Sequence, residues 1–207
     1  MLVIDVDEEH SGIVVQKLSE RRGDMMEMRP SGGGRQRLVF HVPTRGLLGY
    51  QSELLTDTRG TAVMNRLFHA YAPFKGDIPG RRNGVLISTD QGDAVAYALW
   101  NLEARGPMMI EPGWKVYRGM IVGEHTRGND LEVNVLKGKK LTNIRTTSKD
   151  EAVRLTPPIR MTLEKALAYI EDDELVEVTP KSIRLRKKLL DANDRKRDER
   201  ARETESV

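Results

Sequence analysis

Five basic side chains lie close together in the segment LKGKKLTNIRTTSKDE, which runs from Leu136 to Glu151. They are Lys137, Lys139, Lys140, Arg145 and Lys149, and the first acidic residue after Leu136 is Asp150. Neutral polar residues alternate with them: Thr142, Asn143, Thr146, Thr147 and Ser148. Lysine and arginine together with such donors suit phosphate and ribose oxygens. The composition therefore favours contact with a nucleic-acid backbone over sequence reading.

Two other interpretations of this segment were weighed. A nucleotide-binding phosphate loop needs a glycine five residues before Gly138 and a hydroxyl residue after Lys139. Val133 and Lys140 stand there instead, which argues against an NTPase. A solvated connection without a partner stays open, although long polar connections within a domain are usually functional or disordered. Aromatic residues are almost absent, which argues against base stacking.

A second candidate is the stretch Gly46-Leu47-Leu48-Gly49, which follows Arg45 and has the GXXG form that clamps nucleic-acid backbone in KH domains. The alternative is that these glycines let a helix start pack closely on a sheet. In either case Arg45 is expected at a helix N-terminus, where free amides favour phosphate.

The sequence gives little support for a catalytic site or a metal site. The sequence has no cysteine, so disulfides, thiolate metal sites and cysteine nucleophiles are excluded. The four histidines are far apart in sequence; His41 and His69 are expected in one sheet but lack a third ligand. The acidic run from Glu171 to Glu174 is expected to end a helix in water. We therefore expect no catalytic residue, metal or cofactor in this chain.

The composition indicates a globular protein without a membrane span. The chain has 207 residues, of which 38% are hydrophobic and 31% charged, with a net charge of +3. It has no apolar run of 18 residues and no secretory signal pattern, so we expect a cytoplasmic protein. Ten basic and six acidic residues follow from Lys181 onward, which is a local basic excess despite the small total.

The first part of the sequence alternates strands and helices. Strands are expected at 2–6, 25–29, 37–42 and 61–73, a helix at 10–23, a turn at 30–35, and a second helix that Thr44 caps. The order strand, helix, strand, strand, helix, strand predicts a ferredoxin-like βαββαβ domain over residues 1–74.

A glycine- and proline-rich stretch at 75–83 is expected to be a linker. Residues 84–190 then predict a mixed, β-rich α+β domain, with a helix around 93–106, strands near 85–88 and 130–136, and a helix that begins at Thr162. Strands at 175–179 and 182–187 are expected to pair. Residues 191–207 form a charged tail, expected to be disordered or a solvated helix. The fold class is therefore α+β.

Several motifs resemble one family of translational GTPases. EEHSGIVVQKLSERRG, PTRGLLGYQSELLTDTRG and NRLFHAYAP look like the fifth domain of elongation factor G–type GTPases, in the version found in the BipA (TypA) family. The stretch from GEHTRGND to SIRLRKKLL resembles the C-terminal domain of that family. The resemblance covers all but about the last dozen residues, and Trp100 and Trp114 stand where other residues are expected in the family.

The resemblance implies the C-terminal part of a ribosome-associated GTPase that acts in ribosome assembly and stress adaptation. Its partners would be the ribosome, ribosomal RNA and the acceptor arm of A-site tRNA, with the chain as a monomer and no membrane contact. GTP and magnesium would belong to a domain absent from this chain. The implied RNA contacts map onto Lys137, Lys139, Lys140, Thr142, Asn143, Arg145 and Lys149, with Arg127 and Asn129 in the adjoining turn. A protein-docking module without RNA contact remains the alternative.

Overall fold

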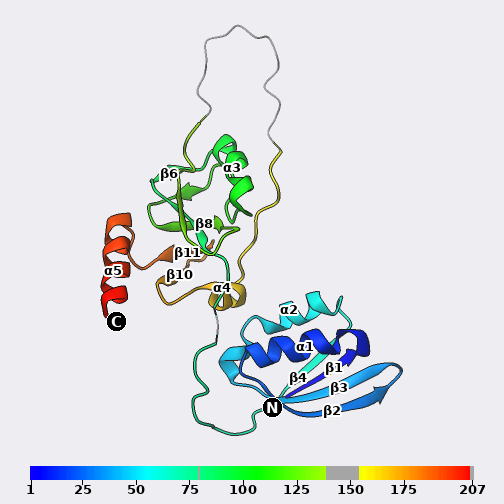
Figure 1. Ribbon diagram of the computed structural model, residues 1–207. Coiled ribbons are helices and arrows are strands. Elements are labelled where there is room, and N and C mark those ends of the chain that lie inside the picture. Colours follow the sequence, from blue (N-terminus) through cyan, green and yellow to red (C-terminus); the bar gives the residue numbers. More distant parts are fainter. Residues whose placement is uncertain (79, 139–153, 206–207) are drawn as a thin grey trace. The chain divides into compact units, whose positions relative to one another are not determined.

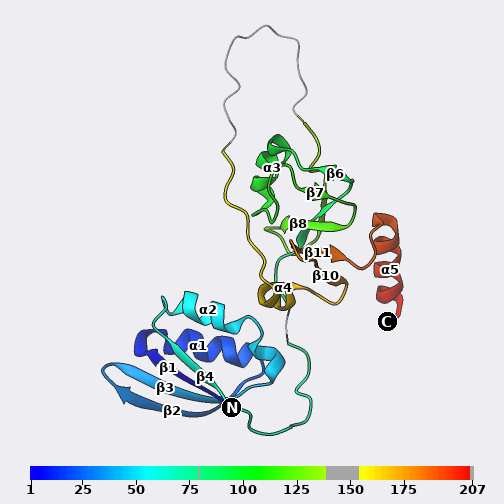
Figure 2. The same ribbon diagram turned by 180° about the vertical axis from the view of Figure 1, so that it is seen from behind.

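The computed structural model describes residues 1–78, 80–138 and 154–205. The chain divides into two compact units, Met1–Gly80 and Arg81–Val207, which are described separately below (Figures 1 and 2). Both units mix helices and strands, so the expected α+β class is confirmed.

The first unit is a four-stranded antiparallel sheet covered by two helices (Figure 1). Its elements are β1 (Leu2–Asp7), α1 (Glu8–Glu20), β2 (Asp24–Gly32), β3 (Arg35–His41), a 3-10 turn η1 (Thr44–Leu47), α2 (Tyr50–Asp57) and β4 (Val63–Arg66). The strand order is β2-β3-β1-β4, and both helices lie on one face. This is the split arrangement that the sequence predicted.

Alternation along the central strands builds the core of this unit. Leu2, Ile4 and Val6 of β1 are fully buried, and Leu38 and Phe40 of β3 lie on the same face. Because side chains alternate between faces in a strand, the residues between them point to the uncovered side. The helices close the core with a second buried set: Val14, Leu18, Tyr50 and Leu54.

Three sequence expectations in this unit were wrong. The turn is shorter than the expected 30–35, because β2 continues through Pro30 to Gly32. Proline lacks a backbone N–H, and this is tolerated here because β2 is an edge strand. The second helix begins at Tyr50 and not after Thr44, since Gly49 has φ +68° and interrupts the helical path. The last strand ends at Arg66, and residues 67–78 have no regular secondary structure.

The second unit is built on a five-stranded sheet and a two-stranded ribbon. The sheet has the order β10-β11-β8-β5-β9, in which only β5 and β9 are parallel, and β6 pairs with β7. Its strands are β5 (Val85–Ser88), β6 (Gly92–Asp93), β7 (Lys115–Val116), β8 (Met120–Glu124), β9 (Leu131–Val133), β10 (Glu174–Val178) and β11 (Ile183–Lys187). The antiparallel pairing of β10 with β11 was predicted.

Helices α3 (Ala96–Leu102), α4 (Leu163–Tyr169) and α5 (Ala192–Glu205) complete this unit, with a 3-10 turn η2 (Glu103–Arg105) after α3. The predicted cap of α4 is present, because the Thr162 side chain accepts a hydrogen bond from the Lys165 amide. Ala166 is fully buried, but Leu163 and Leu167 are exposed, so the predicted apolar face of α4 is only partly in the core. The tail was expected to be disordered or a solvated helix, and in the structure it forms the helix α5.

A network of buried charges ties together segments of this unit that are far apart in sequence. Lys187 is 2% exposed, and its Nζ lies 2.5 Å from Asp130, 2.8 Å from Asp173 and 2.9 Å from Glu174. Burial opposes its charge, but the hydrogen bonds that Lys187 donates to these carboxylates outweigh that effect and raise the pKa of Lys187. The acidic run was expected to lie in water, which is wrong for Asp173 and Glu174 because this buried lysine requires partners.

None of the helices in the described part of the chain is both long enough and apolar enough to cross a membrane.

Candidate nucleic-acid interface

The structure describes four of the ten predicted contact residues. They are Arg127, Asn129 and Lys137 in the second unit and Arg45 in the first, and all but Arg45 are exposed. The remaining predicted residues, Lys139, Lys140, Thr142, Asn143, Arg145 and Lys149, lie outside the described residues. The described ends of the basic segment nevertheless show how the fold supports it.

The N-terminal end of the basic segment leaves the sheet along a fixed path. The carbonyl of Val133 accepts a hydrogen bond from the Thr89 amide, and that of Val135 accepts one from the Val95 amide. The Leu136 amide donates to the Asn134 side chain, and the Leu136 side chain packs against the core cluster of β5, β8 and β9. Lys137 therefore stands exposed directly after an anchored residue.

The C-terminal end returns to the same cluster. Leu155 packs against the core that also holds Leu136. The Thr156 amide donates to the Glu103 carboxylate at 2.5 Å, and the Ile159 amide donates to the Met108 carbonyl at 2.8 Å. Because both ends are held by one core, the basic segment starts and finishes on the same body of the second unit.

Arg127 and Asn129 belong to a separate, tightly held turn between β8 and β9. The Gly84 amide donates to the Arg127 carbonyl at 2.7 Å, and the His125 ring nitrogen Nδ1 lies 2.5 Å from the Asn129 carbonyl. The Asp130 carboxylate accepts a hydrogen bond from the Val85 amide at 2.9 Å. These contacts occupy backbone groups and leave the Arg127 and Asn129 side chains exposed.

The fold does not bring all of the predicted residues together. Asn129 comes before β9 and Lys137 comes after it, so they lie toward opposite ends of this strand. The sequence placed Arg127 and Asn129 next to the basic segment because they are near in the chain. The structure instead has two exposed basic sites, one at each end of β9.

Arg45 has a different environment from the one expected. It lies in η1 and not at the N-terminus of α2, which begins at Tyr50. Its guanidinium donates to the Gly76 carbonyl and lies 4.3 Å from the centre of the Phe74 ring. A Cβ on Gly46 would lie 2.7 Å from the Arg21 carbonyl oxygen, so Gly46 packs closely on the end of α1, whereas the sequence predicted a helix start packed on the sheet.

Sequence reasoning missed an aromatic pair on α3, in which Trp100 is exposed and Tyr97 is half-buried. Trp100 is 49% exposed, and its ring centroid lies 6.3 Å from that of Tyr97. The following turn η2 carries Glu103, which accepts the Thr156 amide beside the end of the basic segment. The signal was a tryptophan among the polar positions of an amphipathic helix, where a surface aromatic can stack on a base.

Two of the four histidines come together in the described part of the chain. His41 and His69 do meet, with ring centroids 4.0 Å apart. The described part of the chain holds no group of three or more histidine, aspartate or glutamate side chains placed to share a metal ion.

Two family models together match the chain. Residues 83–192 match the TypA/BipA C-terminal domain, and residues 1–82 match the elongation factor G C-terminus. The boundary between the two matches lies close to the division between the two compact units.

The chain is also similar to curated proteins named large ribosomal subunit assembly factor BipA. It is 54% identical to the one from Escherichia coli strain K12, 50% to that of Haemophilus influenzae and 47% to that of Bacillus subtilis. These alignments cover 97%, 96% and 97% of this chain, and 33%, 32% and 33% of the relatives. The chain thus spans about a third of the length of the curated relatives it matches.

Proposed function

Because the chain belongs to the TypA/BipA family, we propose that it is a ribosome-binding region of a large-subunit assembly factor. The relatives carry that role in their names. The resemblance implies GTP hydrolysis for the full-length family, and we place that activity in the parts of the relatives that this chain does not align with. We assign no catalytic residue to the chain.

We further propose that the second unit contacts RNA through the basic segment that begins at Lys137. The observation that carries this proposal is the anchoring of both ends, at Leu136 and Leu155, to one core cluster. Such anchoring fixes the two described ends of a strongly cationic segment on the unit. A segment of this composition binds phosphates by charge, with neutral donors on ribose and phosphate oxygens. The expected RNA partners are ribosomal RNA and the acceptor arm of A-site tRNA.

Two described sites would extend this contact. Trp100 offers a ring to an unpaired base beside the C-terminal end of the basic segment. Arg127 and Asn129, on their hydrogen-bonded turn, would meet a second stretch of backbone at the opposite end of β9. Arg45 contributes less in this account, since Gly76 and Phe74 already engage its guanidinium.

Protein docking is a second candidate function, and the first unit favours it. The edge strand β2 exposes Met25, Met26 and Met28 by 49%, 57% and 45%, and Phe68 and Tyr71 are exposed by 77% and 96%. Exposed apolar side chains of this kind mark protein contacts more often than RNA contacts.

A chemical footprint of the chain on large ribosomal subunits, with and without tRNA, separates the two functions. RNA contact predicts protected nucleotides that lose protection when Lys137, Lys139, Lys140 and Arg145 are replaced by alanine. Protein docking predicts binding that survives ribonuclease and leaves no protection that depends on this segment.

A further inference from the structure

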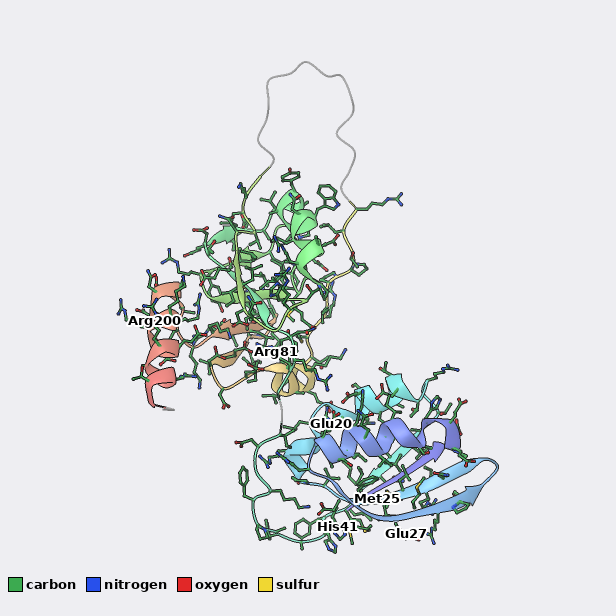
Figure 3. All side chains as sticks on the ribbon, viewed as in Figure 1. Glu20, Met25, Glu27, His41, Arg81 and Arg200 are labelled. Atoms are coloured by element: carbon green, nitrogen blue, oxygen red, sulfur yellow. The ribbon has the colours of Figure 1, made fainter. Side chains whose placement is uncertain are left out.

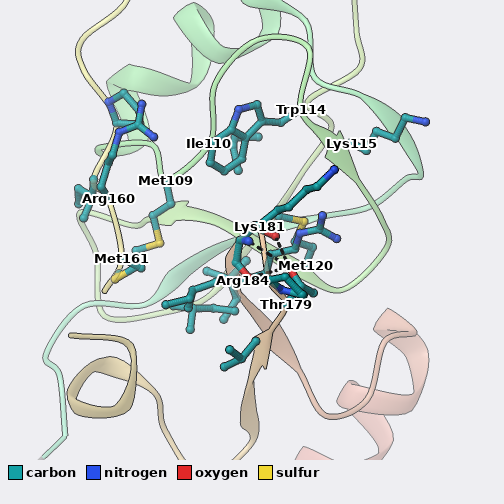
Figure 4. A pocket seen from close by; sticks show the side chains of 18 residues that line it. Met109, Ile110, Trp114, Lys115, Met120, Arg160, Met161, Thr179, Lys181 and Arg184 are labelled. Atoms are coloured by element: carbon teal, nitrogen blue, oxygen red, sulfur yellow. Dashed lines mark hydrogen bonds between the residues drawn. The ribbon is translucent and has the colours of Figure 1, made fainter. Parts of the chain in front are cut away.

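A pocket of about 770 Å³ lies in the second unit, where the turn between β10 and β11 approaches residues 109–110 and 158–161 (Figure 4). Trp114, Lys115 and Met120 complete its wall. This volume is typical of sites for small organic ligands. We propose that the pocket binds one nucleotide unit, with its base on the apolar wall and its phosphate on the basic rim.

The apolar wall is rich in methionine. Met109 and Met120 are 8% and 2% exposed, and Met161 is partly buried against the neighbouring core cluster. Figure 4 shows Met109 and Met161 on one flank of the opening. Thioethers are polarisable and make favourable contacts with aromatic rings, so three of them around one opening suit a planar base.

Trp114 supplies an aromatic surface to the same opening. It is partly buried against the core cluster of β5, β8 and β9, which fixes the indole in place. In Figure 4 the ring lies across the opening from Met120 and Lys181. A base that enters between them has a ring on one side and a thioether on the other. Stacking of this kind contributes about 1–3 kcal/mol per base.

The rim carries an excess of positive charge. Within the described residues, Lys115, Lys181 and Arg184 form no ion pair, whereas Arg160 is paired with Glu111 at 2.5 Å. Lys181 sits on a turn closed by Thr179 and Ser182, whose backbone and side-chain groups are hydrogen-bonded to each other. The fixed turn lowers the entropy that Lys181 loses on binding an anion. The ligand is therefore anionic as well as aromatic.

An acidic, apolar peptide is the competing occupant. A peptide that binds a sheet usually pairs its backbone with a free strand edge. β11 pairs with β10 along its length but with β8 only at Leu185 and Arg186, so the free strand edge beside the pocket is confined to Ile183 and Arg184. An edge of two residues is short for pairing with an extended peptide, which favours a nucleotide as the occupant.

This inference goes beyond the proposed function. The pocket contains none of the residues assigned to the basic segment or to the turn of Arg127, so either proposal can fail alone. The nucleotide unit could be a free nucleotide or an unpaired nucleotide of RNA, and the two sources share the same chemistry.

The test follows the methionine methyl signals of the full chain by NMR during titration. The probes are the four nucleoside monophosphates, inorganic phosphate and a single-stranded RNA hexamer. We expect saturable shifts for Met109, Met120 and Met161, and none for Met25 or Met26 in the first unit. A response to monophosphates identifies a free nucleotide as a sufficient ligand, and a response to the hexamer alone identifies RNA. Either response supports the proposal.

Charge reversal at the rim tests the role of its positive charge. Lys181 and Arg184 lie outside the core, so replacing them should leave the fold intact. Lys181→Glu combined with Arg184→Glu should weaken binding by roughly 10-fold or more. Lys165→Glu combined with Lys188→Glu, exposed positions away from the pocket, should leave the affinity unchanged. Trp114→Leu keeps apolar volume and removes the ring, so it should also weaken binding.

Three results would overturn the proposal. The first is the absence of methyl shifts with every nucleotide and with RNA. The second is an equal response to inorganic phosphate alone. The third is a response to an acidic apolar peptide when no nucleotide gives one. The proposed function is tested by a separate measurement of ribosome binding. None of these three results would count against it.

Discussion

The Arg81 guanidinium donates two hydrogen bonds to the Glu174 carboxylate, at 2.5 Å and 2.6 Å, and the Glu174 side chain is completely buried. Arg81, which is labelled in Figure 3, is the first residue of the second unit. Glu174 opens β10, so the pair joins the start of the unit to this edge strand. Burial opposes the charge on Arg81, but the hydrogen bonds that it donates to Glu174 outweigh that effect and raise the pKa of Arg81.

Replacing Arg81 with methionine should destabilise the second unit strongly. The change leaves Glu174 buried with Lys187 and the Glu171 amide as its remaining partners, and breaking a buried pair costs about 3–5 kcal/mol. Urea unfolding followed by tryptophan fluorescence reports on this unit, because Trp100 and Trp114 both lie in it. Arg118→Met is the control: its pair with Asp191 is exposed, and the expected loss is below about 1 kcal/mol. Equal losses in the two variants would contradict a structural role for the Arg81 pair.

Gly84→Ala should distort the turn that presents Arg127 and Asn129. A Cβ at Gly84 would lie 2.2 Å from the Asn129 carbonyl oxygen, so the backbone must move. The expected loss in unfolding free energy is about 1–3 kcal/mol. Amide NMR shifts should change at the turn between β8 and β9. Gly138→Ala serves as the comparison, because a Cβ there meets no atom within 4 Å. If both variants kept the turn shifts of the parent, this packing would be refuted.

The stack of His41 on His69 predicts a pH dependence of stability. Partial burial and the neighbouring His69 ring lower the pKa of His41 from its ordinary value of 6.5. A lowered histidine pKa means that the folded state binds fewer protons, so this contribution is present above pH 6.5 and is lost as the pH falls. His41→Gln should flatten the dependence of unfolding free energy on pH below 6.5. An unchanged slope in this variant would show that His41 does not titrate in this way.

Trp100→Ala should weaken RNA binding without changing its response to salt. Stacking on one base contributes about 1–3 kcal/mol, which corresponds to a loss of roughly 5- to 150-fold. Because stacking releases no counterions, the slope against salt should stay as in the parent. Tyr71→Ala is a suitable control, since this aromatic is 96% exposed but belongs to the first unit. Unchanged affinity in Trp100→Ala would remove the ring from the interface.

The periodicity of the sequence was sufficient to predict the ferredoxin-like unit. Leu2, Ile4 and Val6 alternate strictly, and one face of the sheet is covered, so period and burial agree. Prediction failed where tertiary contacts overrode local signals. Thr44 is a good helix cap in isolation, but the left-handed Gly49 delays the helix to Tyr50. Residues 67–73 look like a strand, yet β4 ends at Arg66.

The sequence could not show where the predicted contact residues lie on the fold. The turn of Arg127 and the exit of the basic segment at Lys137 are separated by β9, whose parallel pairing with β5 was not foreseen. The partner of the acidic run could not be predicted either. Lysine is usually a surface residue. Lys187 is buried beside Glu174 because β10 pairs with β11.

The salt dependence of binding to large ribosomal subunits tests the central claim most directly. The measurement compares the parent chain with a variant in which Lys137, Lys139, Lys140 and Arg145 are alanine. The control removes the same charge from α5, at Lys196, Arg197, Arg200 and Arg202. Thermal unfolding of each variant confirms that the fold is retained.

Contact with about five phosphates predicts that the parent loses roughly 100- to 500-fold in affinity between 50 and 200 mM salt. The variant of the basic segment should lose only about 3-fold over this range, and the α5 variant should behave as the parent. The same steep salt dependence in the variant of the basic segment as in the parent would contradict the account.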